Sequence, residues 1–179
     1  MRFQMEKMTA ENLPEIMDVM EDARKSVTKQ EWFVADEEDY VKQVLEGNGF
    51  LVGAREKESR ELAGFFMVFY PDAQDNLGQY AGLTEKELSK VIYMDSAAVK
   101  EKYRGNGLQG RMLRQAEALL RQNQKEKGQT VQYGMCTIHP DNISSLHTME
   151  KNGYEIAARR KLYGGLDRYI LCKKIGSSL

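Results

Sequence analysis

The feature that most constrains the fold is a junction near the middle of the chain, where an apolar run meets a periodic one. Residues 91–99 have the length and composition of a β-strand, and residues 108–126 repeat apolar side chains at helical spacing. Between these segments, Gly105 and Gly107 let the backbone turn tightly. A strand that leads into an amphipathic helix predicts a fold that mixes sheet and helices, of the α/β (α+β) class.

The remaining sequence alternates between the same two patterns. Predicted strands cover residues 2–8, 50–55, 62–70, 130–138, 154–163 and 168–173, and the second and third of these form a hairpin. Predicted helices cover residues 9–27 with Thr9 as the cap, 36–45 with Asp36 at the start, 84–90 and 142–152. We expect a single domain over residues 1–175, a partly ordered lid at 71–90 and a frayed tail at 176–179.

Composition excludes several classes of protein. The chain has 179 residues, with 26 basic against 27 acidic side chains. No stretch approaches the roughly 18 consecutive apolar residues of a membrane span, and the first residues lack the apolar core of a signal peptide. We therefore expect a cytoplasmic protein without a membrane partner. Cys136 and Cys172 have no cysteine or histidine at ligand spacing, which predicts buried free thiols and no metal site.

The near-neutral total hides a basic segment. Residues 100–127 carry a net charge of +5, so the rest of the chain carries −6. A basic segment inside an acidic protein indicates a local anionic ligand, because nucleic-acid binding usually requires a basic domain overall.

The glycine loop is the natural place for such an anion. Its sequence, YRGNGLQG from Tyr103 to Gly110, opens a helix, where backbone N–H groups point outward and bind phosphate. Cationic side chains surround it, at Lys100, Lys102, Arg104 and Arg111. Without those charges, an ordinary strand-to-helix turn would explain the glycines.

Two nucleotide-binding motifs fit this loop poorly. The glycines satisfy G-x-G-x-x-G, but five residues separate Val99 from Gly105, and the stretch 130–132 lacks the acidic residue of a dinucleotide fold. An NAD-dependent oxidoreductase therefore rests on the glycine spacing alone. A Walker loop fails because Arg111 and Met112 stand where Lys and Ser or Thr should follow the glycine.

The loop resembles the central signature of the GNAT superfamily of acyl-CoA-dependent N-acetyltransferases, R/Q-x-x-G-x-G/A after a strand that ends in Val. Arg104 and Gly107 match, whereas Gln109 departs from the pattern and Gly110 follows it directly. The second signature, an Asn-led helix that ends in E-K-x-G-[FY], is matched within HPDNISSLHTMEKNGY by Asn142, Glu150, Lys151, Gly153 and Tyr154. The resemblance is specific over residues 91–154.

This resemblance implies a mixed, mostly antiparallel sheet flanked by helices, in which the parallel strands 91–99 and 130–138 splay to admit acetyl-CoA. It implies that Ala98 and Val99 pair with the pantetheine amides and that Asn142 binds from the facing helix, although helix capping alone would also explain Asn142. The pyrophosphate would lie on residues 104–110, with Arg104, Gly105, Asn106, Gly107, Gln109 and Gly110 as the contacts.

Acetyl transfer to an amine requires a base for the amine proton and a donor for the leaving thiolate. Asp95 is the first candidate base, because the family often places a carboxylate there, and His139 at the end of a parallel strand is the second. Each has an ordinary alternative, as a solvated strand carboxylate and an exposed loop histidine. Met149 stands where many relatives have a tyrosine, and a thioether cannot donate a proton. The proton for the leaving thiolate would therefore have to come from water, Ser144, Ser145 or a nearby tyrosine.

We therefore predict an N-acetyltransferase that acetylates a primary amine of a small molecule or peptide by direct attack, with a homodimer as one possible assembly. The alternative is a catalytically silent acyl-CoA-binding or sensing module. The acceptor would meet segment 71–90, which has an excess of acidic residues, with aromatic side chains nearby. These candidates are Asp72, Asp75, Glu85, Glu87, Tyr80, Trp32 and Phe33.

Overall fold

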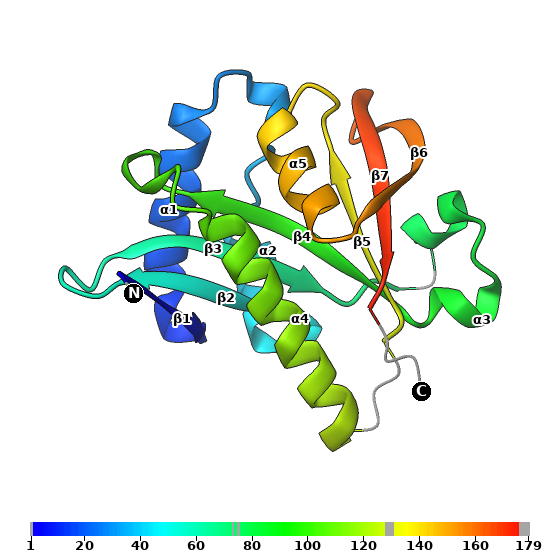
Figure 1. Ribbon diagram of the computed structural model, residues 1–179, viewed down its shortest axis with the longest axis horizontal. Helices are drawn as coiled ribbons and strands as arrows, with labels where there is room; N and C mark the ends of the chain where they lie inside the picture. Colours follow the sequence, from blue (N-terminus) through cyan, green and yellow to red (C-terminus); the bar gives the residue numbers. More distant parts are fainter. Residues whose placement is uncertain (1, 73, 75, 128–130, 176–179) are drawn as a thin grey trace. The chain divides into compact units, whose positions relative to one another are not determined.

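The computed structural model describes residues 2–72, 74, 76–127 and 131–175 (Figure 1). They form two compact units. The first contains the chain through Phe69 together with Ser96–Ala116, and the second contains Tyr70–Asp95 and the chain from Glu117 onward. Strand β4 (Val91–Val99) and helix α4 (Leu108–Lys127) each run from one unit into the other. The predicted tail 176–179 lies outside the described residues, and the single domain stays a prediction.

The first unit is built on three antiparallel strands in the order β1-β2-β3. The strands are β1 (Phe3–Lys7), β2 (Gly49–Glu56) and β3 (Leu62–Phe69), and β2 and β3 form the predicted hairpin. The helices are α1 (Leu13–Ser26) and α2 (Glu38–Gln43), followed by a π-helical turn at Val44–Asn48; 3₁₀ turns lie at Ala10–Asn12, Gln30–Trp32 and Glu101–Tyr103.

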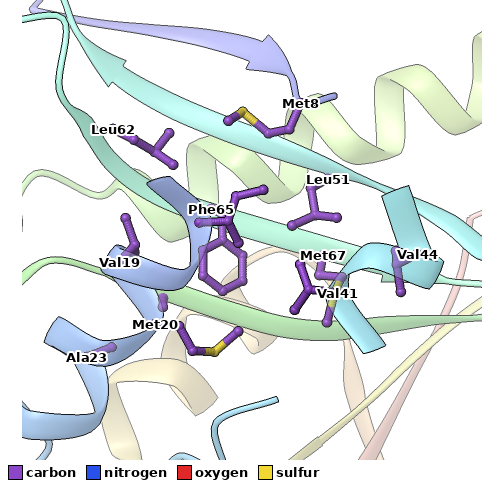
Figure 2. Close-up of a cluster of buried hydrophobic side chains, with 12 residues drawn as sticks. Met8, Val19, Met20, Ala23, Val41, Val44, Leu51, Leu62, Phe65 and Met67 are labelled. Carbon is purple, nitrogen blue, oxygen red and sulfur yellow. The ribbon is translucent and has the colours of Figure 1, made fainter. Parts of the chain in front are cut away.

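The core of this unit joins the two helices to the sheet. Helix α1 buries one apolar stripe against β2 and β3, because its apolar residues recur every three to four positions. Figure 2 shows Val19, Met20 and Phe65 meeting at the centre of this cluster. The other labelled members come from α1, α2, β2, β3 and the ends of β1 and α2: Met8, Ala23, Val41, Val44, Leu51, Leu62 and Met67. Ala98 of β4 belongs to the same core, which ties β4 to this unit.

Both predicted helix starts in this unit differ in detail. Thr9 caps a 3₁₀ turn, where its backbone N–H donates to Asn12 Oδ1 over 2.9 Å, and α1 begins only at Leu13. The prediction that Asp36 opens the second helix is wrong. Glu37 is the N-cap, and Asp36 instead accepts a hydrogen bond from Ser96 of β4. A long-range partner has replaced the local capping bond.

The second unit contains strands in the order β4-β5-β7-β6. They are residues 91–95 of β4, β5 (Tyr133–Ile138), β6 (Glu155–Leu162) and β7 (Leu166–Lys174). Its helices are α3 (Glu85–Leu88) and α5 (Ile143–Lys151), with a 3₁₀ turn at Leu77–Ala81. The β5–β7 and β6–β7 pairs are antiparallel, whereas β4 and β5 run parallel.

The parallel ladder is short. It joins Val91 to Tyr133 at one end and Tyr93 to Met135 at the other. Beyond Tyr93 and Met135 no β4–β5 pair occurs among the described residues of the second unit, although both strands continue. The mixed, mostly antiparallel sheet with a separating parallel pair confirms the predicted fold class.

The described part of segment 71–90 is a packed element. Asn76 is fully buried, and its amide nitrogen donates to the carbonyls of Asp72 and Leu88, 3.2 Å from each. The hydroxyl of Tyr93 accepts a bond of 2.9 Å from the Leu77 N–H, and Leu77 packs against a cluster that includes Met135. Residues 76–90 therefore do not form the expected lid. They pack on the sheet and cover its apolar surface.

Cys136 and Cys172 are free thiols, Cys136 buried and Cys172 half-buried. Burial raises the pKa of the Cys136 thiol far above its ordinary value, which makes it unreactive. In the part of the chain that the structure describes, no helix is both long enough and apolar enough to span a membrane.

Candidate active site

The glycine loop adopts a conformation that side chains rarely take. Gly105 has φ of 79° and Gly107 has φ of 63°, and an added Cβ at either position would meet no atom within 4 Å. Asn106 holds the turn, because its amide nitrogen donates to the carbonyl of Tyr103 over 2.9 Å. The backbone on this side of the loop is therefore open to a ligand.

Helix α4 begins directly after this loop. The first helical bond runs from the Arg111 N–H to the Gly107 carbonyl, 3.2 Å apart. The N–H groups of a first helical turn have no acceptor within the helix, and the helix dipole adds partial positive charge there. No acidic residue occupies this first turn of α4. The chemistry of this helix end suits an anion, as the sequence predicts.

Of the four cationic side chains predicted around the glycine loop, two are paired with carboxylates in the structure. Lys100 donates to Asp18 and to Glu61, the latter over 2.9 Å, and Lys102 donates to Glu61 over 2.7 Å. Bonds from Lys102, Lys100 and Tyr103 lower the pKa of Glu61 to about 2. The charges of both lysines are thus compensated by carboxylates of the same unit, and they add little to an anion site.

No carboxylate compensates the charge of Arg104 among the described residues. Its guanidinium donates to the hydroxyl of Ser26 over 2.6 Å and to the Ser26 carbonyl over 3.2 Å. Both acceptors are neutral, so they orient the side chain without cancelling its charge. The Arg111 guanidinium donates to another neutral group, the Phe3 carbonyl, over 3.1 Å. Arg104 is therefore the side chain of this loop best suited to pair with a phosphate.

Ala98 and Val99 form the end of β4 in the first unit. Ala98 is buried in the core, and the N–H of the following residue, Lys100, bonds to the Ala63 carbonyl of β3 over 2.9 Å. Gly64 lies beside them, where an added Cβ would stand 2.7 Å from the Ala98 carbonyl. This close packing fixes the backbone of β4 immediately before the glycine loop.

The candidate bases belong to the second unit. Asp95 is half-buried on β4, past the last β4–β5 pair. His139 follows β5 and is buried, contrary to the exposed alternative; its Nδ1 accepts a bond of 3.1 Å from the Asp141 N–H. A neutral imidazole that accepts at Nδ1 carries its proton on Nε2, so His139 must change partner before it can act as a base.

Asn142 is the N-cap of α5, because its side-chain oxygen accepts from the Ser145 N–H over 3.3 Å. Capping thus explains its position at the helix start, while its amide nitrogen has no bonded partner among the described residues. Met149 of the same helix is buried in the core. A thioether cannot donate a proton, so the acid must come from another element.

Asp36 is a partly buried carboxylate whose environment the sequence reasoning missed. Its carboxylate accepts from the Ser96 hydroxyl over 2.5 Å, and burial raises its pKa although that bond opposes the shift. No cation pairs with it within the described residues. Four residues earlier, the buried indole Nε1 of Trp32 also lacks a partner there. No local pattern could reveal this, because the Asp36–Ser96 contact spans 60 residues of sequence.

The structure therefore gathers the predicted residues in two groups. The first unit holds Ala98, Val99 and the loop 104–110, and the second holds Asp95, His139 and Asn142. The predicted acceptor residues are likewise divided. Phe33 packs against the first core, whereas Tyr80 of the second unit lies under the Arg160 guanidinium, 5.5 Å from it; Asp75 is outside the described residues.

An anion-binding helix end after a glycine turn, on a mixed sheet whose parallel strands separate, defines the scaffold of an acyl-CoA-dependent acyltransferase. The chain belongs to the acetyltransferase (GNAT) family, whose model matches residues 13–154. The protein is accordingly an N-acetyltransferase that uses acetyl-CoA, and the resemblance seen in the sequence is confirmed.

Solved structures of acetyltransferases share this fold. The structure of a putative acetyltransferase from Salmonella typhimurium with acetyl-CoA is 13% identical, with a TM-score of 0.71 and coverage of 99% of this chain and 96% of that one. Ribosomal-protein-S18-alanine N-acetyltransferase from Escherichia coli is 12% identical, with a TM-score of 0.70 and coverage of 98% and 96%. PaiA N-acetyltransferase from Thermoplasma acidophilum with coenzyme A is 16% identical, with a TM-score of 0.65 and coverage of 97% and 99%. No curated protein sequence matches the chain significantly.

Proposed function

We propose that the protein acetylates a primary amine of a small molecule or peptide by direct attack, with the substrate acetyl-CoA held along the end of β4 and the start of α4. The observation that carries this proposal is the pair of left-handed glycines, Gly105 and Gly107, which lead into a helix end free of acidic residues. Acetyl-CoA supplies the activated acetyl group; the remaining tasks fall to the chain.

Within this proposal, the backbone N–H groups of residues 104–110 hold the diphosphate, and the Arg104 guanidinium adds a charged bond. Asn106 keeps the loop in shape, and Gln109 and Gly110 contribute first-turn amides. Ala98 and Val99 offer strand amides to the pantetheine, and the Asn142 amide nitrogen donates to the same substrate.

Calorimetric titration with coenzyme A tests this cradle. Gly107→Val should lose binding at least tenfold, because a β-branched residue at positive φ distorts the loop. Gly82→Val is the matched control, since Gly82 also has positive φ, at 71°, and open space around it, but lies in the turn after Leu77–Ala81. Equal affinity of both variants, or no heat with the unaltered protein, would contradict the cradle.

Asp95 is the proposed base, which takes the proton that the amine nitrogen loses on attack. Asp95→Asn should lower kcat with little change in the affinity for acetyl-CoA, and unchanged kcat at every pH would remove Asp95 from the mechanism. His139 is the second candidate. His139→Gln keeps a side-chain acceptor for the Asp141 N–H, so a loss of kcat in this variant would favour His139.

The acceptor is proposed to be a cationic alkylamine, and the uncompensated carboxylate of Asp36 supports this choice. Buried charges in proteins are normally paired, so this carboxylate suits an ammonium group. Benzylamine, which is charged at neutral pH, should be acetylated better than aniline, which is neutral, and Asp36→Asn should remove the preference by raising KM for benzylamine. An unchanged preference would argue against this role.

A peptide with a free N-terminus and a small alkylamine both offer a primary amine of this kind. The Escherichia coli neighbour is named for acetylating an alanine of ribosomal protein S18. Release of free coenzyme A thiol over a panel of peptides with free N-termini and small alkylamines separates the two. Binding without turnover over the whole panel would instead favour the silent acyl-CoA module. Cytoplasmic residence and a homodimer stay predictions.

A further inference from the structure

The acid for the leaving thiolate is the one chemical role that the proposed function leaves without a residue. Among the tyrosines with bonds in the described structure, several commit their hydroxyl protons to carboxylates. These are Tyr103 to Glu61 over 2.8 Å, Tyr133 to Glu87 over 2.6 Å and Tyr154 to Glu117 over 3.1 Å. Tyr93 uses its hydroxyl to accept from the Leu77 N–H.

Tyr163 differs from the three tyrosines that donate to carboxylates. It lies in the turn between β6 and β7 and is 59% exposed. Its hydroxyl is 3.1 Å from Thr137 Oγ1, where either atom can donate. When Thr137 donates, the phenol proton of Tyr163 is free for another acceptor. Thr137 lies two residues past Met135, the last β5 residue that pairs with β4.

The backbone at Tyr163 supports a functional reason for this residue. Its φ is 51°, and Gly164 and Gly165 after it have φ of 79° and 107°. The Gly165 N–H bonds to the Leu162 carbonyl over 3.1 Å, which closes a tight turn through Tyr163 and Gly164. Glycine or asparagine normally occupies such positions, and a bulky residue there is strained. The chain keeps a tyrosine where a smaller residue would fit with less strain.

Charges on both sides act on this phenol. Partial loss of solvent around the phenol, the largest cause, and the negative charge of Asp95 raise the pKa of Tyr163, while the Thr137 bond and the positive charge of Arg168 lower it. The Arg168 guanidinium is 5.9 Å from the centre of the ring. A phenol held in its protonated form, within the field of the proposed base, is the protonation state that an acid requires.

We propose that Tyr163 is the general acid of acetyl transfer and donates its phenol proton to the coenzyme A sulfur. This role rests on the proposed function. The bound alkylammonium first releases one proton to water, because only the neutral amine can attack. As the amine nitrogen then bonds to the acetyl carbon and the carbon–sulfur bond breaks, Asp95 takes a second proton from nitrogen and Tyr163 gives one to sulfur. The Tyr163 phenolate then recovers a proton from the Asp95 carboxyl, so both side chains return to their starting states.

The first test is Tyr163→Phe, with Tyr169→Phe as the control for a partly exposed tyrosine of the same unit. We expect kcat of Tyr163→Phe to fall roughly 10²- to 10⁴-fold, the usual contribution of general acid catalysis. The affinity for coenzyme A, measured by calorimetry, should stay within about twofold. Unchanged kcat, or a kcat loss matched by a loss of affinity, would overturn the acid role. An unaltered protein that binds no coenzyme A would instead refute the proposed function.

The second test follows the alkaline limb of the pH–rate profile, because a general acid stops working when it is deprotonated. Placing 3,5-difluorotyrosine at position 163 lowers the phenol pKa and should move the limb to lower pH. Thr137→Val removes the bond that lowers this pKa and should move the limb to higher pH. A structural role for Tyr163 would leave the limb in place in both proteins, and that result would overturn the proposal even if Tyr163→Phe misfolds.

Discussion

The hydroxyl of Tyr154 donates to Oε1 of Glu117, 3.1 Å away, in the interior of the second unit. Tyr154 is the aromatic residue that closes the second family motif, and Glu117 lies in α4. Lys173 of β7 donates to the same carboxylate over 2.7 Å. The motif tyrosine therefore joins the residue before β6 to α4, and burial raises its pKa so that it stays a donor.

Tyr154→Phe should lower the free energy of unfolding by about 1 kcal/mol, the usual net contribution of one hydrogen bond to stability. The loss stays small because Lys173 still compensates the Glu117 carboxylate. Urea denaturation measures the change. Tyr80→Phe, at an exposed position, should lie within about 0.5 kcal/mol of the unaltered protein. A change as small for Tyr154→Phe would show that this bond does not stabilise the fold.

Arg55 is the buried centre of an ion cluster in the first unit. Its guanidinium donates to Glu6 over 2.6 Å, to Glu15 over 2.7 Å and to the Arg60 carbonyl over 2.6 Å. Arg55→Ala should cost about 1–3 kcal/mol in unfolding free energy, because it removes the hydrogen-bond donor of two carboxylates that water can still partly solvate. Arg24→Ala, which breaks an exposed pair with Glu21, is the control and should cost less than about 1 kcal/mol.

Glu61 should make stability depend on acid pH. Its pKa falls from the ordinary 4.5 to about 2 in the folded protein, chiefly because Lys102 and Lys100 donate to it. A depressed folded pKa means that the stabilisation is complete above about 4.5 and is lost as pH falls toward 2. Thermal melts between these limits should therefore show a flatter pH dependence in Glu61→Gln, but not in the exposed control Glu11→Gln. Parallel curves for Glu61→Gln and the unaltered protein would contradict this.

Tyr163 should show a conflict between stability and activity. A side chain in the left-handed conformation destabilises the fold by about 1–2 kcal/mol, and the extra backbone freedom of glycine destabilises it by about 0.5–1 kcal/mol. Tyr163→Gly removes the first cost and adds the second, so the melting temperature should rise slightly. Turnover should fall with the loss of the phenol. Arg60, whose φ is 61°, offers the control: Arg60→Gly should also raise the melting temperature but leave turnover unchanged. A lower melting temperature for both variants would show that neither backbone is strained.

The sequence alone determined the parts of this protein that depend on local geometry. The strand at Val91–Val99 was predicted to the residue, and α5 within one residue of each end, because side-chain periodicity and caps act over a few residues. The glycine loop before α4 was predicted for the same reason, since positive φ is a property of single residues. Its family signature then indicated the acyl-CoA chemistry.

Only the tertiary structure decided which charged and polar groups meet. Lys100 joins Glu61 across 39 residues of sequence, and this removes a cation that the sequence had assigned to the anion site. Asp36 was predicted to begin a helix but instead accepts a hydrogen bond from Ser96. The hydroxyls of Tyr163 and Thr137 share a hydrogen bond across 26 residues of sequence. Such contacts depend on strand order and register, which bring distant segments together, and no local pattern in the chain encodes them.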